Sequence, residues 1–265
     1  MEVLYGLHPV EEAVRSGARR LDGVLLARDR TDARLERLAE TCRAAGVRVS
    51  LESREQLTRM SRTDAHQGVV ALVRERACLG VEDLLEAKRD VGFRFFLALD
   101  GIEDPHNLGA LLRTADGAGV DGVVLPERRS APVTATVAKA SAGASEHVRI
   151  ARVTNLVRAL EQMKQANVWV IGLDERGTPD YMDFDFRTDC VLVLGREGAG
   201  LHELVKKTCD HLLRIPMAGR VASLNVSVAG AVVMYEAMRQ RRRPVEAVAS
   251  VKAAGAGKPR KGLGS

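Results

Sequence analysis

The chain has 265 residues, of which 46% are hydrophobic, and a formal net charge of +5. It contains no run of about 18 apolar residues and no charged N-terminal segment followed by an apolar one, which argues against a membrane span and a secretory signal. We therefore expect a cytoplasmic protein. The four cysteines form no CxxC pair and have no metal-ligand spacing with histidine, so we expect reduced structural thiols and no metal site. They are Cys42, Cys78, Cys190 and Cys209.

The first 73 residues predict a small α/β unit. Helical periodicity covers Pro9–Arg15 and Ala33–Ala45, while extended apolar patterns cover Gly23–Leu26, Val47–Leu51 and Val69–Val73. A charged segment, residues 74–91, follows with a short predicted helix at 81–88. We expect it to act as a connector about which two domains can move.

Residues 92–243 predict a parallel sheet with helices on both faces, because short apolar runs alternate with helical patterns such as Leu156–Gln165. Periodicity alone favours a Rossmann-type strand order. The apolar runs are Phe95–Leu99, Val123–Leu125, Val168–Ile171, Val191–Leu194 and Leu212–Ile215.

Three polar segments follow strands of this region. The first, DGIEDPHNLGALLRTADGAGVDGVVLP at 100–126, reads as a loop, a helix and a strand. Asn107 is a predicted N-cap, and Gly117 and Gly119 are predicted to stop the helix. Arg113 lies six residues after Asn107, so its side chain could point back toward the loop or out into water.

The second segment, VLVLGREGAGLHEL at 191–204, predicts a strand that enters a tight glycine turn and then a helix. Its GxxGxG spacing departs from the dinucleotide fingerprint GxGxxG, and no acidic residue follows at the distance that would bind a ribose. This argues against a nicotinamide enzyme. Glu197 is compatible with a catalytic role, with a pair to Arg196 or another arginine, or with a favourable charge at a helix start.

The third segment runs through a glycine-containing loop into a helix at 215–243. Ser223 or Asn225 can cap that helix, and Val228, Val232, Val233 and Met238 recur at helical spacing. Free N–H groups at the helix entrance suit an anionic or carboxylate-bearing ligand. An ordinary capped, buried helix is the alternative.

Taken in this order, the three segments resemble the three motifs of the SpoU/TrmH family, which are RNA ribose 2′-O-methyltransferases of the SPOUT class. The residues that carry the resemblance are Asn107 and Arg113, then Gly195, Glu197 and Gly198, then Ser223, Leu224 and Asn225. GLHPVEEAV near the N-terminus, DAHQGVVALV at 64–73 and RSAPVTATVAKASAGASEHV at 129–148 further resemble the bacterial 23S rRNA guanosine 2′-O-methyltransferase branch. The similarity extends nearly to Arg243.

The resemblance implies the fold and the domain organisation. Residues 1–73 would form an L30e-like domain that binds the RNA substrate, and residues 74–91 a linker. Residues 92–243 would form the SPOUT α/β-knot domain, a parallel sheet with a deep trefoil knot, which no local pattern reveals. The family also implies a homodimer whose active site draws on both subunits.

The resemblance further implies S-adenosylmethionine as cofactor and a ribose 2′-hydroxyl as acceptor. The implied cofactor contacts, mainly through the backbone, are Gly195, Gly198, Ile215, Met217 and Leu224. The implied catalytic residues are Asn107, Arg113, Glu197, Ser223 and Asn225. Arg113 would act either as a base or as a contact for the neighbouring phosphate, and we favour the phosphate contact because a guanidinium is effectively always protonated.

The basic residues are concentrated at the C-terminal end. Residues 239–265 hold eight basic residues against Glu246 alone, which leaves 32 basic and 34 acidic residues in the rest of the chain. Net charge is therefore poor evidence that the folded body binds RNA. We expect residues 244–265 to be a disordered basic tail that either adds salt-sensitive phosphate contacts or serves only as a solvated extension.

Two other classes of function remain open at this point. One is a 2′-O-methyltransferase that acts on another rRNA site, as antibiotic-resistance enzymes do, or on tRNA. The other is a non-catalytic RNA-binding factor in ribosome assembly, against which the intact motif residues argue.

Overall fold

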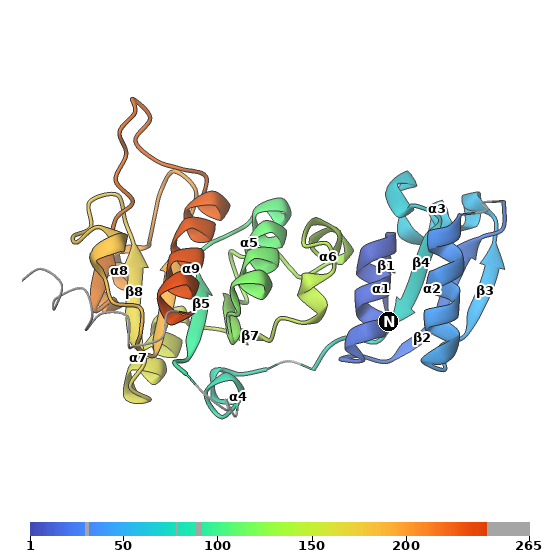
Figure 1. The fold of residues 1–265 in the computed structure, drawn as a ribbon, viewed down its shortest axis with the longest axis horizontal. Coiled ribbons are helices and arrows are strands. Elements are labelled where there is room, and N and C mark those ends of the chain that lie inside the picture. Colours follow the sequence, from blue (N-terminus) through green and yellow to red (C-terminus); the bar gives the residue numbers. More distant parts are fainter. Residues whose placement is uncertain (30–31, 78, 88–91, 243–265) are drawn as a thin grey trace, which may run out of the picture.

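The computed structural model describes residues 1–29, 32–77, 79–87 and 92–242, which form two sheet-based domains side by side along the long axis of the molecule (Figure 1). The predicted tail at 244–265 and Cys78 lie outside the described residues.

The N-terminal domain is a four-stranded sheet in the order β1-β4-β2-β3, in which β2 and β3 are parallel and the other pairs antiparallel. Its strands are β1 (Glu2–Tyr5), β2 (Leu21–Ala27), β3 (Val49–Glu52) and β4 (Val69–Val73). Its helices are α1 (Leu7–Ser16), α2 (Ala33–Ala44), α3 (Arg54–Ser61) and the 3-10 turn η1 (Asp64–His66). The predicted elements are confirmed, but the sequence analysis missed β1 and α3.

The second domain is built on six parallel strands in the order β10-β8-β9-β5-β6-β7. They are β5 (Phe95–Leu99), β6 (Gly122–Pro126), β7 (Ile150–Val153), β8 (Trp169–Leu173), β9 (Cys190–Leu194) and β10 (His211–Leu213). A Rossmann sheet would pair the fourth strand with the first. Here β9 lies between β5 and β8, so the Rossmann-type order is wrong; the trefoil knot stays a prediction.

Helices cover both faces of this sheet, which explains its nearly uninterrupted apolar strands. In β5, Phe95, Leu97 and Leu99 pack in the core that includes helices α5 and α9, while Phe96 and Ala98 pack in the core with α7 and α8. The helices and 3-10 turns are α4 (Val81–Leu85), α5 (Pro105–Ala118), α6 (Ala135–Ala140), η2 (Ala144–Glu146), α7 (Leu156–Gln165), η3 (Tyr181–Asp183), α8 (Glu203–Thr208) and α9 (Val226–Arg242).

Helix α5 begins earlier than predicted. Asp104 is its N-cap, with Oδ1 accepting from the His106 backbone N–H at 2.8 Å, and Pro105 occupies the first helical position, which suits its missing N–H. The prediction of Asn107 as N-cap is wrong. Gly119, at φ +72, ends the helix in the left-handed conformation, as expected, whereas Gly117 lies inside the helix and does not stop it.

The segment between the domains is attached to the second domain. The Arg152 N–H donates to the Leu79 carbonyl at 3.0 Å, and Leu79 forms a parallel bridge with Ala151 on β7. Arg76 also donates to three carbonyls of residues 145–148. Arg76 and Leu79 are therefore held by the second domain, and motion of the domains about this segment stays a prediction.

Candidate functional site

The three polar segments meet at one edge of the six-stranded sheet. Asp100 follows β5, Gly195 follows β9, and the loop at 214–225 follows β10, so all three leave the carboxyl ends of parallel strands. Ligands of open α/β sheets bind at this edge.

Three side chains, one from each segment, form a hydrogen-bonded group that we call the site cluster: Asn107, Glu197 and Asn225. Asn107 Nδ2 donates to Glu197 Oε2 at 3.2 Å, and Asn225 Nδ2 donates to Glu197 Oε1 at 3.3 Å and to Asn107 Oδ1 at 3.0 Å. Asn107 is buried, whereas Glu197 and Asn225 are exposed. Both carboxylate oxygens of Glu197 thus accept from neutral amides, so no cation within the cluster neutralises its charge.

Asn225 also starts helix α9. Its Oδ1 accepts from the Ser227 N–H at 2.9 Å and from Ser227 Oγ at 2.6 Å, which confirms one of the two predicted caps. The predicted apolar face of this helix is only partly right, because Val233 is fully buried whereas Val228 is 49% exposed.

The glycine segment forms a closed loop. The backbone groups of Arg196 and Gly200 bond reciprocally, at 3.0 and 2.9 Å. A Cβ at Gly195 would lie 2.2 Å from the Gly200 carbonyl carbon, so glycine is required there by the loop itself. Gly198 and Gly200 adopt φ +74 and +66, which other residues reach only with strain.

Two cavities adjoin this loop. The larger, about 470 Å³, is within the range of small-molecule sites. The five predicted cofactor residues, Gly195, Gly198, Ile215, Met217 and Leu224, all line it, and so do Glu197 and Ser223. The smaller, about 300 Å³, is lined by residues 101–104 with Asn107, Arg196, Glu197 and Val226. Arg196 and Glu197 therefore separate the two cavities.

The larger cavity offers unused hydrogen-bonding groups. Within the described part of the chain, no backbone–backbone hydrogen bond uses the N–H or C=O groups of residues 215–224. The Nε of Arg196 is buried and has no partner among the described residues. Buried polar groups are rarely left unpaired, so the Arg196 Nε fits a polar ligand such as a nucleoside. The backbone groups of residues 216–224 are exposed and open to the same ligand.

Arg113 lies apart from the cavities. Its side chain is exposed on α5, lines neither cavity, and makes no hydrogen bond or ion pair among residues that the structure describes. A single chain therefore brings Asn107, Glu197, Ser223 and Asn225 to one place, but not Arg113.

The sequence analysis missed two acidic residues that also follow strands. Asp100, 5% exposed, accepts from His202 through Oδ1 at 2.8 Å from Nδ1 and through Oδ2 at 2.7 Å from the backbone N–H. Asp174 lines the larger cavity and accepts from Lys206 Nζ at 2.7 Å. Burial acts to raise the pKa of Asp174, but hydrogen bonds from Lys206 and the Arg176 N–H outweigh it and lower the pKa. An acidic residue directly after a parallel strand was the signal for both.

Over the described ranges, no three His, Cys, Asp or Glu side chains group closely enough to hold a metal ion. None of the helices in those ranges has both the length and the apolar character that crossing a bilayer requires.

Two family models match the chain. The model of the SpoU rRNA Methylase family matches residues 94–235, and the model described as RNA 2′-O ribose methyltransferase substrate binding matches residues 3–77. Together they span both domains.

Known proteins agree with these models. The chain is 43% identical to the 23S rRNA (guanosine-2′-O-)-methyltransferase RlmB of Ralstonia nicotianae, over 91% of this chain and 96% of that protein. It is 42% identical, with the same coverage, to Bacillus subtilis YacO, whose name assigns it to the TrmH family of tRNA/rRNA methyltransferases. The fold is also similar to a crystal structure of the SpoU methyltransferase AviRb from Streptomyces viridochromogenes in complex with AdoMet. The two chains align over 90% of each, with a TM-score of 0.75 and 27% sequence identity. The chain belongs to the SpoU rRNA methylase family.

Proposed function

We propose that this protein transfers a methyl group from S-adenosylmethionine to the ribose 2′-hydroxyl of a guanosine in 23S rRNA. The observation that carries the proposal is the site cluster, in which one residue from each of three separate segments meets beside a cavity of about 470 Å³. The choice of 23S rRNA rests on the relatives, because RlmB of Ralstonia nicotianae is named for that reaction.

The larger cavity would hold the cofactor, which supplies an electrophilic methyl group on a sulfonium sulfur. Gly195, Ile215 and Leu224 would bind it through their backbone groups, with Gly198 and Met217 alongside. The unused backbone groups of residues 215–224 and the unpaired Arg196 Nε support this assignment.

The smaller cavity, across Glu197, would hold the acceptor ribose. The 2′-hydroxyl must lose its proton as its oxygen bonds to the methyl carbon, while the bond from that carbon to the sulfonium sulfur breaks and leaves S-adenosylhomocysteine. Glu197 is the exposed carboxylate between the cavities. Asn107 and Asn225 fix its orientation through their amides, and Ser223 would contact the acceptor from the larger cavity, which it lines.

Arg113 would reach the site from a second copy of the chain and bind the phosphate beside the acceptor. This accounts for an exposed arginine that has no partner among the described residues, on the helix that also carries Asn107. The homodimer is supported by exposed apolar side chains at the start of α9 and in the loop before it, at Val221, Leu224 and Val228.

We further propose that residues 1–73 bind the RNA substrate, that 74–91 join the two domains, and that 92–243 carry out methyl transfer in the cytoplasm. The match of residues 3–77 to a substrate-binding model supports the first of these roles.

The experiment is methylation of 23S rRNA from cells that lack this gene, using labelled S-adenosylmethionine and mapping by resistance to alkaline cleavage. We expect one new 2′-O-methylguanosine, which Arg113→Ala abolishes without loss of cofactor binding. Methylation of tRNA alone would contradict the proposed substrate, and cofactor binding without methylation of naked rRNA, ribosomal precursors or tRNA would contradict the proposed reaction.

A further inference from the structure

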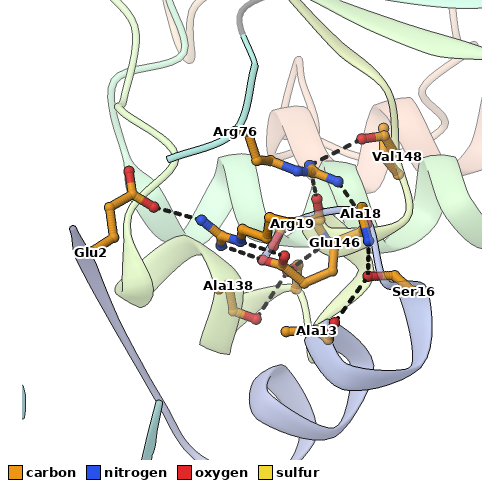
Figure 2. A network of polar contacts seen from close by, with 11 residues as sticks. Glu2, Ala13, Ser16, Ala18, Arg19, Arg76, Ala138, Glu146 and Val148 are labelled. Atoms are coloured by element: carbon orange, nitrogen blue, oxygen red, sulfur yellow. Dashed lines mark hydrogen bonds and ion pairs between the residues drawn. The ribbon is translucent and has the colours of Figure 1, made fainter. Parts of the chain in front are cut away.

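The contact between the two domains contains a group of four charged residues, two of which have buried side chains. We call it the junction cluster: Glu2, Arg19, Arg76 and Glu146 (Figure 2). Arg19, in the loop before β2, donates to both carboxylate oxygens of Glu146, through Nε at 2.9 Å and Nη2 at 2.7 Å. Its Nη1 donates to Glu2 at 2.6 Å. The N-terminal domain thus holds a carboxylate of the second domain by a bidentate pair.

Arg76 holds the backbone of the same turn. Its Nη2 donates to the Glu146 carbonyl at 2.6 Å, and its Nη1 donates to the carbonyls of Ser145 and Val148. The side chains of Arg19 and Glu146 are only 6% and 1% exposed. A charge buried to this degree is tolerated only when it is paired and hydrogen-bonded. The pair between Arg19 and Glu146 forms only when the two domains are in contact, so separating the domains would break it.

The shapes of the two domains also fit closely here. A Cβ at Gly143 would lie 2.7 Å from Glu12 Cβ and 3.1 Å from the His8 carbonyl oxygen, so glycine allows helix α1 to approach η2. At the other end of the contact, Lys139 Nζ donates to the Ala65 carbonyl at 2.8 Å. Contacts at two separate places fix the angle between the two domains as well as the distance between them.

The docked turn is connected directly to the candidate site. Helix α6, just before η2, packs against α5 so closely that a Cβ at Gly109 would lie 2.4 Å from Ala140 Cβ. The same helix α5 carries Asn107 and Arg113. The N-terminal domain therefore contacts the segment α6–η2, and α6 packs against α5, the helix that supplies site residues.

We propose that Arg19, Arg76 and Glu146 are positioning residues that fix the N-terminal domain at one angle to the methyltransferase domain. This inference rests on the proposed function. An RNA held by residues 1–73 would then present one nucleotide, at a fixed span, to the cavities beside Glu197. Loss of the junction cluster would weaken productive RNA binding while leaving the cofactor site intact.

The test compares Glu146→Gln with Glu11→Gln in the full chain. Glu11 forms a surface ion pair at 2.6 Å with Arg15, which lies on the same helix of the N-terminal domain. Because this pair does not cross between the domains, Glu11→Gln serves as the matched control. Spin labels at Glu40→Cys and Glu161→Cys, with Cys78→Ser, report the distance between the domains. KM for 23S rRNA, kcat and the cofactor Kd are measured alongside.

We expect Glu146→Gln to broaden the distance distribution and to raise KM for rRNA by about 10-fold, with the cofactor Kd unchanged. An unchanged distribution, or a cofactor Kd that worsens in parallel, would overturn the proposal. If Glu146→Gln does not fold, Arg19→Lys keeps the charge but loses the bidentate geometry. Wild-type behaviour of that variant would overturn the proposal equally. The distance measurement needs no RNA, so it remains decisive even if the proposed methylation fails.

Discussion

The site cluster and the junction cluster are two solutions to holding a carboxylate between distant segments of one chain. Glu197 is exposed and accepts from two neutral amides, whereas Glu146 is buried and accepts from a guanidinium. Amides orient a carboxylate but leave its charge available to a ligand; a buried guanidinium pair neutralises the charge. The difference indicates that one cluster is arranged for chemistry and the other for architecture.

Truncating each carboxylate should separate these roles most clearly. We expect Glu146→Ala to lower the free energy of unfolding by about 3–5 kcal/mol, because Arg19 would be left buried without its main partner. Glu197→Ala should change it by about 1 kcal/mol or less, since the site is exposed. Urea denaturation of both variants measures this, and equal losses would show that the two clusters do not differ in the way that we infer.

Removing only the negative charge of Glu197 in the site cluster should lower turnover. Glu197→Gln presents an NH₂ group where Asn107 and Asn225 both donate, so one amide contact must break. We expect kcat to fall on the order of 10²-fold with little change in melting temperature. Glu203→Gln, on the exposed first turn of α8, is the control, and a variant at position 197 with wild-type kcat would exclude Glu197 from the reaction.

Gly195 in the site and Gly143 at the domain contact allow the same comparison between the two regions, because each permits a close backbone approach. Alanine at Gly195 would collide with Gly200, and overpacking of about 1–3 kcal/mol should weaken cofactor binding by roughly 10-fold. Alanine at Gly143 would meet Glu12 and should instead broaden the interdomain distance while cofactor affinity persists. Calorimetric titration with S-adenosylmethionine distinguishes them, and a larger affinity loss at Gly143 would contradict the assignment.

The smallest expected effect concerns the thiols of both domains, of which Cys42 and Cys190 are buried and Cys209 is partly buried. Burial raises the pKa of Cys42 to about 11 and of Cys190 and Cys209 to about 12, from 9.0. The unfolded chain would release these protons first as pH rises above about 9, so stability should fall in that window and not below it. Peptide-resolved alkylation at pH 8 should find the three thiols protected until the protein unfolds, and rapid labelling of the native protein would show that the sites open.

The sequence predicted those parts of the fold that local pattern determines. Helix α7 was predicted at its observed bounds because Leu156–Gln165 has strong helical periodicity, and β5 because an entirely apolar run needs cover on both faces. It missed β7, in which only Ala151 is buried, and the position of β9 between β5 and β8. Strand order depends on pairing partners far apart in the chain, which periodicity does not report.

The site was predicted by motif and corrected by geometry. The apolar helical pattern after Asn107 predicts a cap at that residue, but Asp104 before Pro105 is the better start signal. The amide of Asn107 is instead used in the site cluster. The junction cluster was not foreseen, since Arg19 and Glu146 are 127 residues apart and neither belongs to a recognisable motif.

The junction cluster also has a consequence for the order in which the chain is made. Glu2, Arg19 and Arg76 leave the ribosome before Glu146, which follows Arg76 by 70 residues. The N-terminal sheet can close on its own strands at once, but both arginines must stay hydrated until the turn at 144–146 has been synthesised. Seating of the first domain is therefore a late event in biogenesis. A nascent chain stalled before that turn would carry Arg19 paired with Glu2 alone, and Arg76 without the three carbonyls to which it donates in the complete chain.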